Sequence, residues 1–100
     1  TLRAAKADAG LMDKGAQVGV LSQRRQQLTS RIGGYADQIR SLDTQSALIA
    51  DELTGLKSLA EKGLVPMPRI RALERQQAEI EGQRAELRAS IQQSREAMGE

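Results

Sequence analysis

A heptad repeat of apolar residues runs through the middle of this 100-residue chain and constrains its fold more than any other feature. From about Gln17 onward, apolar side chains recur at alternating spacings of three and four residues, which places them on one helix face, here called the seam. This pattern predicts a helix over residues 17–62, about 68 Å long at about 1.5 Å per residue. Its seam positions are Val18, Leu21, Arg25, Leu28, Ile32, Tyr35, Ile39, Leu42, Ser46, Ile49, Leu53 and Leu56.

A second repeat of the same kind predicts a returning helix over residues 68–99. A helix gains most of its stability by packing its apolar face against a partner, so the two helices are expected to pack together. The composition agrees: Ala, Leu, Gln, Arg and Glu dominate, and Tyr35 is the single aromatic residue, whereas a compact core normally uses aromatic side chains. The seam positions of the second helix are Ile70, Leu73, Gln77, Ile80, Arg84, Leu87, Ile91, Ser94 and Met98.

The stretch between the two repeats predicts a tight turn over residues 63–67. Lys62 and Gly63 are typical of a helix end, because a cation suits the last turn and glycine adopts the left-handed cap conformation without steric cost. Pro66 and Pro68 cannot continue a helix, but proline is tolerated in the first turn of a new one. Helices joined by so short a turn run antiparallel. The predicted fold is therefore all-α: a long antiparallel two-helix coiled-coil hairpin.

The beginning of the chain predicts a short additional helix over residues 1–14. Its apolar residues lie at spacings of three and four, and Asp13-Lys14-Gly15 is typical of a helix end. These apolar residues are Leu2, Ala5, Ala9 and Met12. We expect the chain to be one helical domain and a fragment of a larger protein, because it starts without methionine and ends within a heptad pattern.

The heptads leave the alignment of the two helices open, because shifts of half a heptad give similar numbers of apolar layers. Polar residues at seam positions specify alignment at a cost in stability, and Arg25, Gln77 and Arg84 are the candidates. Gly33-Gly34 is the weak point of the long helix. Two glycines inside a helix cost about 1 kcal/mol each relative to alanine, so a bend can form there.

The residue types argue against catalytic and metal chemistry. The chain has no Cys and no His, so it lacks thiolates and the commonest general base and metal ligand. Its carboxylates are dispersed and no glycine-rich phosphate loop precedes a helix, so we expect no enzyme activity, no cofactor and no metal site. Arg69, Arg71 and Arg75 form a small basic cluster, but Glu74 and Glu79 dilute it. No nucleic-acid partner is therefore expected, despite the net charge of +2.

Residues 52–75 carry a resemblance to a known family. The run begins with the acidic–leucine pair Glu52-Leu53, contains Gly63-Leu64-Val65, and ends with Leu73-Glu74-Arg75. This order resembles the helical hairpin of the haemolysin-D-like membrane fusion proteins, which are the periplasmic adaptors of type I secretion systems. The branch that serves secreted proteases and lipases is the most similar. The resemblance covers about residues 17–100.

The resemblance implies a function in protein export. In this family the hairpin projects into the periplasm of the Gram-negative envelope from a protein anchored in the inner membrane. Copies of the adaptor assemble into a ring, typically hexameric, and work with an inner-membrane ABC transporter. The hairpin tip docks onto a TolC-like outer-membrane channel. The alternative that the heptads alone also fit is a generic structural coiled-coil rod or tether without a docking tip.

The turn carries the candidate partner-binding residues. Related multidrug-efflux adaptors mark the tip with Arg, Leu and Ser at set positions; Leu59 matches the Leu, whereas Gly55 and Pro66 stand at the places of Arg and Ser. The resemblance therefore implies that apolar packing and backbone, rather than the efflux-type polar groups, make the channel contact. The candidate tip residues are Leu59, Gly63, Leu64, Val65, Pro66 and Arg69.

Two further interpretations of the apolar residues outside the seam stay open. Those of the turn can also close the end of the coiled coil, because a hydrophobic contact often accompanies a helix cap. Those on the outside of the long helix are candidates for lateral contacts between neighbouring hairpins. The latter residues are Ala47, Leu48 and Ala50.

Overall fold

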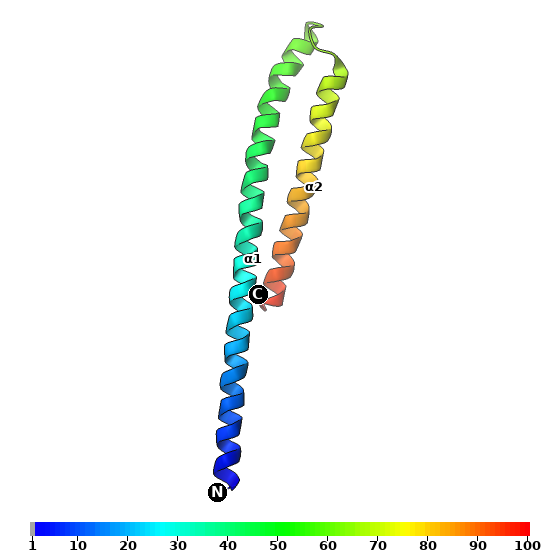
Figure 1. Ribbon diagram of the computed structural model, residues 1–100. Coiled ribbons are helices and arrows are strands. Elements are labelled where there is room, and N and C mark those ends of the chain that lie inside the picture. Colours follow the sequence, from blue (N-terminus) through cyan, green and yellow to red (C-terminus); the bar gives the residue numbers. More distant parts are fainter. Residues whose placement is uncertain (1) are drawn as a thin grey trace.

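The computed structural model describes the backbone of residues 2–100 and the side chains of residues 14–100. Two helices, α1 (Leu2–Glu61) and α2 (Met67–Ala97), run antiparallel and are joined by a turn of residues 62–66 (Figure 1). The described residues contain no strand. The molecule is a rod with principal extents of 92 × 15 × 14 Å. The predicted all-α hairpin is thereby confirmed.

The N-terminal part of α1 differs from the prediction. The helix is continuous from Leu2, so a separate short helix over residues 1–14 is not confirmed; Thr1 and the side chains before Lys14 lie outside the described residues. The interruption predicted at Asp13-Lys14-Gly15 is absent because one interior glycine costs only about 1 kcal/mol. Helix propagation from the favourable residues on both sides outweighs that cost. Gly33-Gly34 also lies within the continuous helix.

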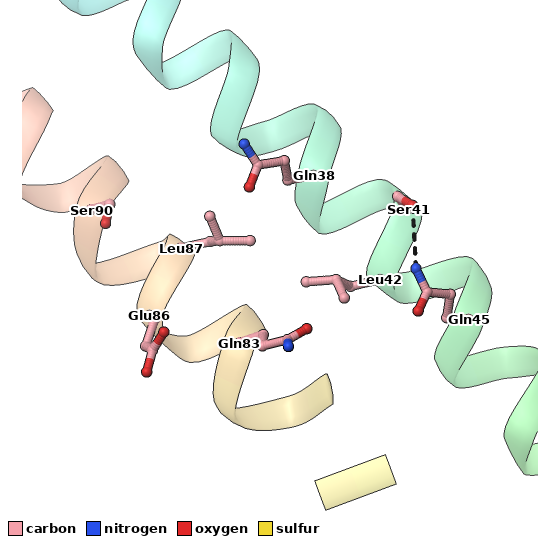
Figure 2. Close-up of a pocket in the computed structure, with 8 residues that line it drawn as sticks. All are labelled: Gln38, Ser41, Leu42, Gln45, Gln83, Glu86, Leu87 and Ser90. Atoms are coloured by element: carbon pink, nitrogen blue, oxygen red, sulfur yellow. Dashed lines mark hydrogen bonds between the residues drawn. The ribbon is translucent and has the colours of Figure 1, made fainter. Parts of the chain in front are cut away.

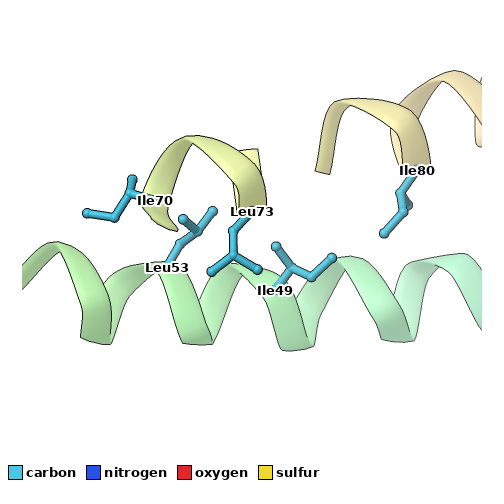
Figure 3. Close-up of a cluster of buried hydrophobic side chains, with 5 residues drawn as sticks. All are labelled: Ile49, Leu53, Ile70, Leu73 and Ile80. Carbon is cyan, nitrogen blue, oxygen red and sulfur yellow. The ribbon is translucent and has the colours of Figure 1, made fainter. Parts of the chain in front are cut away.

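The core of the hairpin is the seam between the two helices. The predicted heptad positions from Leu28 to Leu56 on α1 and from Ile70 to Met98 on α2 are all buried or half-buried. Burial of one such aliphatic side chain contributes about 1.5–3 kcal/mol, so the seam holds the two helices together. The most buried cluster occupies the half of the hairpin nearer the turn and consists of Ile49, Leu53, Ile70, Leu73 and Ile80 (Figure 3).

Three predicted seam residues near the start of the heptad run, Val18, Leu21 and Arg25, lie outside the packed seam. Val18 and Leu21 are each 65% exposed. Val18 and Leu21 belong to α1 and lie level with the C-terminal end of α2, where they line a shallow groove with Ala97 and Met98. α1 extends beyond this point without a partner helix among the described residues (Figure 1). The heptad pattern therefore extends farther toward the N-terminus of α1 than the packing of α1 against α2 does.

Three ion pairs, two between the helices and one from α1 to Glu100 just after α2, show the alignment that the heptads left open. Arg69 Nη2 lies 3.3 Å from Glu52 Oε1, Arg84 Nη2 lies 2.7 Å from Asp43 Oδ1, and Arg25 Nη2 lies 3.2 Å from Glu100 Oε1. Two of the three arginines, Arg25 and Arg84, are the polar seam residues expected to specify the alignment.

Of the three arginines in these ion pairs, Arg84 is the one whose charge is costly to keep, because it is partly removed from water. Its side chain is half-buried, and it also pairs with Glu81 on α2. Its Nε atom has no hydrogen-bond partner. A half-buried ion pair gains little net stability because desolvation of the charges offsets their attraction. Arg84 therefore contributes alignment more than stability to the seam.

Candidate functional site

The C-terminal end of α1 is closed by backbone hydrogen bonds around Gly63. The Gly63 N–H donates to the carbonyl of Ala60 (N···O 2.9 Å), and the Leu64 N–H donates to that of Leu59 (3.0 Å). Gly63 has a φ of 72°, in the left-handed region. This pair of hydrogen bonds with a left-handed glycine is the Schellman motif. The carbonyls of Leu59 and Ala60, which have no partner inside the helix, are thus satisfied by backbone donors of the turn.

The start of α2 is set by proline. Pro66 occupies the cap position with an extended backbone (φ −70°, ψ 141°), and its carbonyl accepts a hydrogen bond from the Arg69 N–H (3.1 Å). Pro68 follows in the first turn, where its missing N–H removes no helical hydrogen bond. With one end fixed by Gly63 and the other by Pro66, the turn has little conformational freedom.

Apolar side chains are exposed on both sides of this turn. Leu59 is 40% exposed, Leu64 is 68% exposed and Met67 is 50% exposed. We call these three residues the apolar tip. Val65, in contrast, is half-buried and so belongs partly to the closure of the coiled coil.

A charged residue and a shallow groove flank the apolar tip. Arg69 is exposed and pairs with Glu52 across the two helices, an arrangement that adds little to stability because both side chains remain in water. The groove lies between the helices just below the turn and has Ala60, Met67 and Ile70 among its lining residues. Its other lining residues are the charged Lys57, Glu61 and Glu74.

A second groove lies about halfway along the hairpin (Figure 2). Leu42 of α1 and Leu87 of α2 point toward each other there, and amide and hydroxyl side chains surround them. These groups donate and accept hydrogen bonds, as Gln45 does to Ser41 (3.5 Å), but they include no nucleophile paired with a base. The polar lining residues are Gln38, Ser41, Gln45, Gln83, Glu86 and Ser90.

The part of the chain that the structure describes contains no cluster of His, Cys, Asp or Glu suited to a metal ion. Neither described helix has a stretch long and apolar enough to cross a membrane.

The structure brings the predicted site residues together at one end of the rod, in the turn and the helix ends beside it (Figure 1). Leu59, Leu64 and Pro66 are exposed there. Their binding role stays a prediction. Met67 was not among the predicted site residues, although its position between two prolines, at the first residue of α2, was a signal for its exposure.

Gly63→Ala should destabilise the hairpin by about 1–2 kcal/mol, because an L-residue is strained in the left-handed region. A Cβ atom at this position would meet no atom within 4 Å, so the loss would come from the backbone rather than from a clash. Gly55→Ala is the matched control: it also adds a methyl group in open space, but inside α1, where it should stabilise by about 1 kcal/mol. Thermal unfolding followed by circular dichroism measures both changes, and equal shifts would contradict the role assigned to Gly63.

Comparison with known proteins identifies the family of the hairpin. The family model described as "AprE, long alpha-helical hairpin" matches residues 8–100. A curated relative, the type I secretion system membrane fusion protein PrsE of Rhizobium meliloti (strain 1021), is 43% identical over 77 residues. That match covers 77% of this chain but 18% of the relative, and no solved structure matches the chain. The resemblance to the haemolysin-D-like hairpins is thereby confirmed, and the chain belongs to the AprE family of long α-helical hairpins.

Proposed function

We propose that this hairpin is part of the adaptor subunit of a type I secretion system. Its tip docks onto a TolC-like outer-membrane channel, and the protein that carries it bridges this channel to an inner-membrane ABC transporter for protein export. The hairpin is then a periplasmic segment of an inner-membrane-anchored protein. Its task is assembly rather than catalysis, and it needs no cofactor, metal or nucleic acid.

The observation that carries this proposal is the exposure of the apolar tip at the end of a rod 92 Å long. Single exposed apolar residues are normal on protein surfaces, but Leu59, Leu64 and Met67 gather at one turn. Removing apolar surface from water gains about 25 cal/mol per Å². Because Gly63 and Pro66 already fix the turn, docking costs little conformational entropy there.

The small size of the tip favours docking by several copies together. A stable protein interface buries about 1,200–2,000 Å² in total, far more than three side chains at one tip supply. Tips held side by side in one assembly would add their contacts, because each later contact becomes intramolecular once the first has formed. A ring of adaptor copies, hexameric in the proposed assembly, would meet this requirement.

The relative supports the same system, since PrsE is a type I secretion system membrane fusion protein. The generic rod or tether is the competing function. A rod needs its seam, whereas a docking protein also needs its apolar tip.

The test is a polar-tip variant, Leu59→Gln/Leu64→Gln/Met67→Gln, in the intact protein. After chemical cross-linking in cells, purification of this variant should recover at least tenfold less outer-membrane channel than the wild type. A matched control places three glutamines at exposed apolar residues far from the turn, near the C-terminal end of α2. These residues are Val18, Val20 and Leu21. Equal recovery of the channel by the wild type and the polar-tip variant would favour the rod.

A further inference from the structure

The outer face of α1, opposite the seam, carries an exposed leucine. Leu48 is 64% exposed although it lies within the part of α1 that packs against α2. Thr44 and Asp51, one turn away on either side, are also exposed. Leu48 is therefore an apolar side chain with no contact partner suited to it within its own hairpin.

The outer face of α2, in contrast, carries two small residues. Ala78 and Gly82 are exposed neighbours one turn apart, and a Cβ atom at Gly82 would meet nothing within 4 Å. Arg75 lies one turn before Ala78 on the same face. Small residues let another helix approach closely, so this face can receive a larger side chain.

The two faces lie at the same height along the rod. The ion pairs Glu52–Arg69 and Asp43–Arg84 bracket this part of the hairpin on both helices. Since each residue advances both helices by about 1.5 Å, residues 44–51 of α1 are level with about residues 75–82 of α2. Within a single hairpin, however, the two faces point away from each other, because both are exposed on the sides opposite the seam.

Charges on the two faces are complementary. Asp51 and Arg75 form no ion pair with any other described residue. They lie at similar heights but on opposite faces of the hairpin, one on α1 and the other on α2. Two copies placed side by side in the same orientation would therefore bring Asp51 of one copy to Arg75 of the other.

We propose that neighbouring copies of this hairpin pack side by side and in the same orientation, with the outer face of α1 on the outer face of the next copy's α2. Leu48 lies on Ala78 and Gly82 of the neighbour, and Asp51 pairs with Arg75. The contact buries one leucine, for a gain of about 1.5–3 kcal/mol. The exposed ion pair adds little affinity but disfavours the reversed orientation.

This inference rests on the proposed assembly of several copies and names the surface through which they meet. Each hairpin has one face of each kind, on opposite sides, so the contact is heterologous. Heterologous contacts repeat from copy to copy and form a ring when the rotation closes. The same contact would hold all tips at one level.

Cysteine pairs test the contact directly, because the chain has no cysteine of its own. Leu48→Cys combined with Ala78→Cys in the intact protein should give a ladder of disulfide-linked multimers after oxidation in cells. A disulfide within one hairpin is ruled out, because its Cα atoms must lie within about 7 Å and the two faces point apart. Thr44→Cys with Gly82→Cys should give the same ladder one turn away.

Two controls test height and orientation. Leu48→Cys with Gln92→Cys keeps the same helix face but shifts the second cysteine by about 21 Å, so it should give no ladder. Leu48→Cys alone should also give none. Dimers from this single cysteine would show that identical faces meet, and that result would overturn the proposal.

Charge reversal provides an independent readout. In the Leu48→Cys/Ala78→Cys background, Asp51→Arg or Arg75→Asp should each lower the cross-linking yield about two- to fivefold, and the combination should restore it. Absence of the ladder in a cysteine variant that still exports protein would overturn the lateral contact and leave the proposed function standing. Recovery of as much outer-membrane channel by the polar-tip variant as by the wild type would instead refute the proposed function.

Discussion

Replacing Leu64 by Asp is expected to abolish protein export while leaving the hairpin folded. Leu64 is the most exposed residue of the apolar tip, so its substitution removes no packing inside the hairpin. In a docked tip, the change loses the apolar contact and places a carboxylate in an interface, which costs about 1–3 kcal/mol or more per copy. Because several copies dock together, these costs add, and exported protein in the medium should fall at least tenfold.

Two control variants separate a tip contact from a general effect of charge. Leu64→Met keeps an apolar side chain and should retain export. Val20→Asp makes the same kind of change at a residue 65% exposed near the other end of the hairpin, and it should also retain export. Circular dichroism should give the same helicity for all three variants. Normal export by Leu64→Asp would refute docking through the tip.

Ile70→Ala should have the largest effect on stability. Ile70 is 2% exposed and belongs to the buried cluster in the half of the hairpin nearer the turn. Truncating a buried isoleucine to alanine costs about 2–5 kcal/mol, because transfer energy is lost and a cavity remains. For a small domain, this loss should lower the midpoint of thermal unfolding by at least about 10 °C.

Leu64→Ala is the matched comparison for this second prediction. It also truncates an aliphatic side chain close to the turn, but an exposed one, so its effect should stay within about 0.5 kcal/mol. The two residues thus separate stability from docking: Ile70 supports the hairpin, and Leu64 is available to a partner. Similar unfolding midpoints for both alanine variants would contradict this separation.

The packed part of the seam was predictable from the sequence because burial in a coiled coil follows heptad position. Every seam position from Leu28 to Leu56 was predicted correctly. Val18, Leu21 and Arg25 were not, since their burial depends on where α2 ends rather than on their own spacing. The interruption expected at Asp13-Lys14-Gly15 overestimated what one glycine costs a long helix.

The alignment of the helices was not predictable from apolar spacing, because shifted layers bury similar side chains. It became clear from charged partners: Arg84 meets Asp43 and Arg25 meets Glu100. Asp43 and Glu100 lie outside the seam pattern, so the spacing of the seam residues does not reveal them.

The position of the candidate site was more predictable than its composition. Glycine and proline defined the turn, so the residues around Gly63 and Pro66 were expected at one end of the rod. The division between exposed and half-buried side chains was not, because it depends on the direction in which each turn residue leaves the backbone. Val65 is half-buried, for example, whereas Met67, two residues later, is exposed.

The position of the buried cluster has a mechanical consequence. Ile49, Leu53, Ile70 and Leu73 lie in the half of the hairpin nearer the turn, whereas the polar Arg84 interrupts the seam farther along. Local opening costs least where few apolar contacts must break, so the helices separate first at the end away from the turn. The helices can therefore separate at the end away from the turn when a neighbouring part of the protein moves, while the tip keeps its shape.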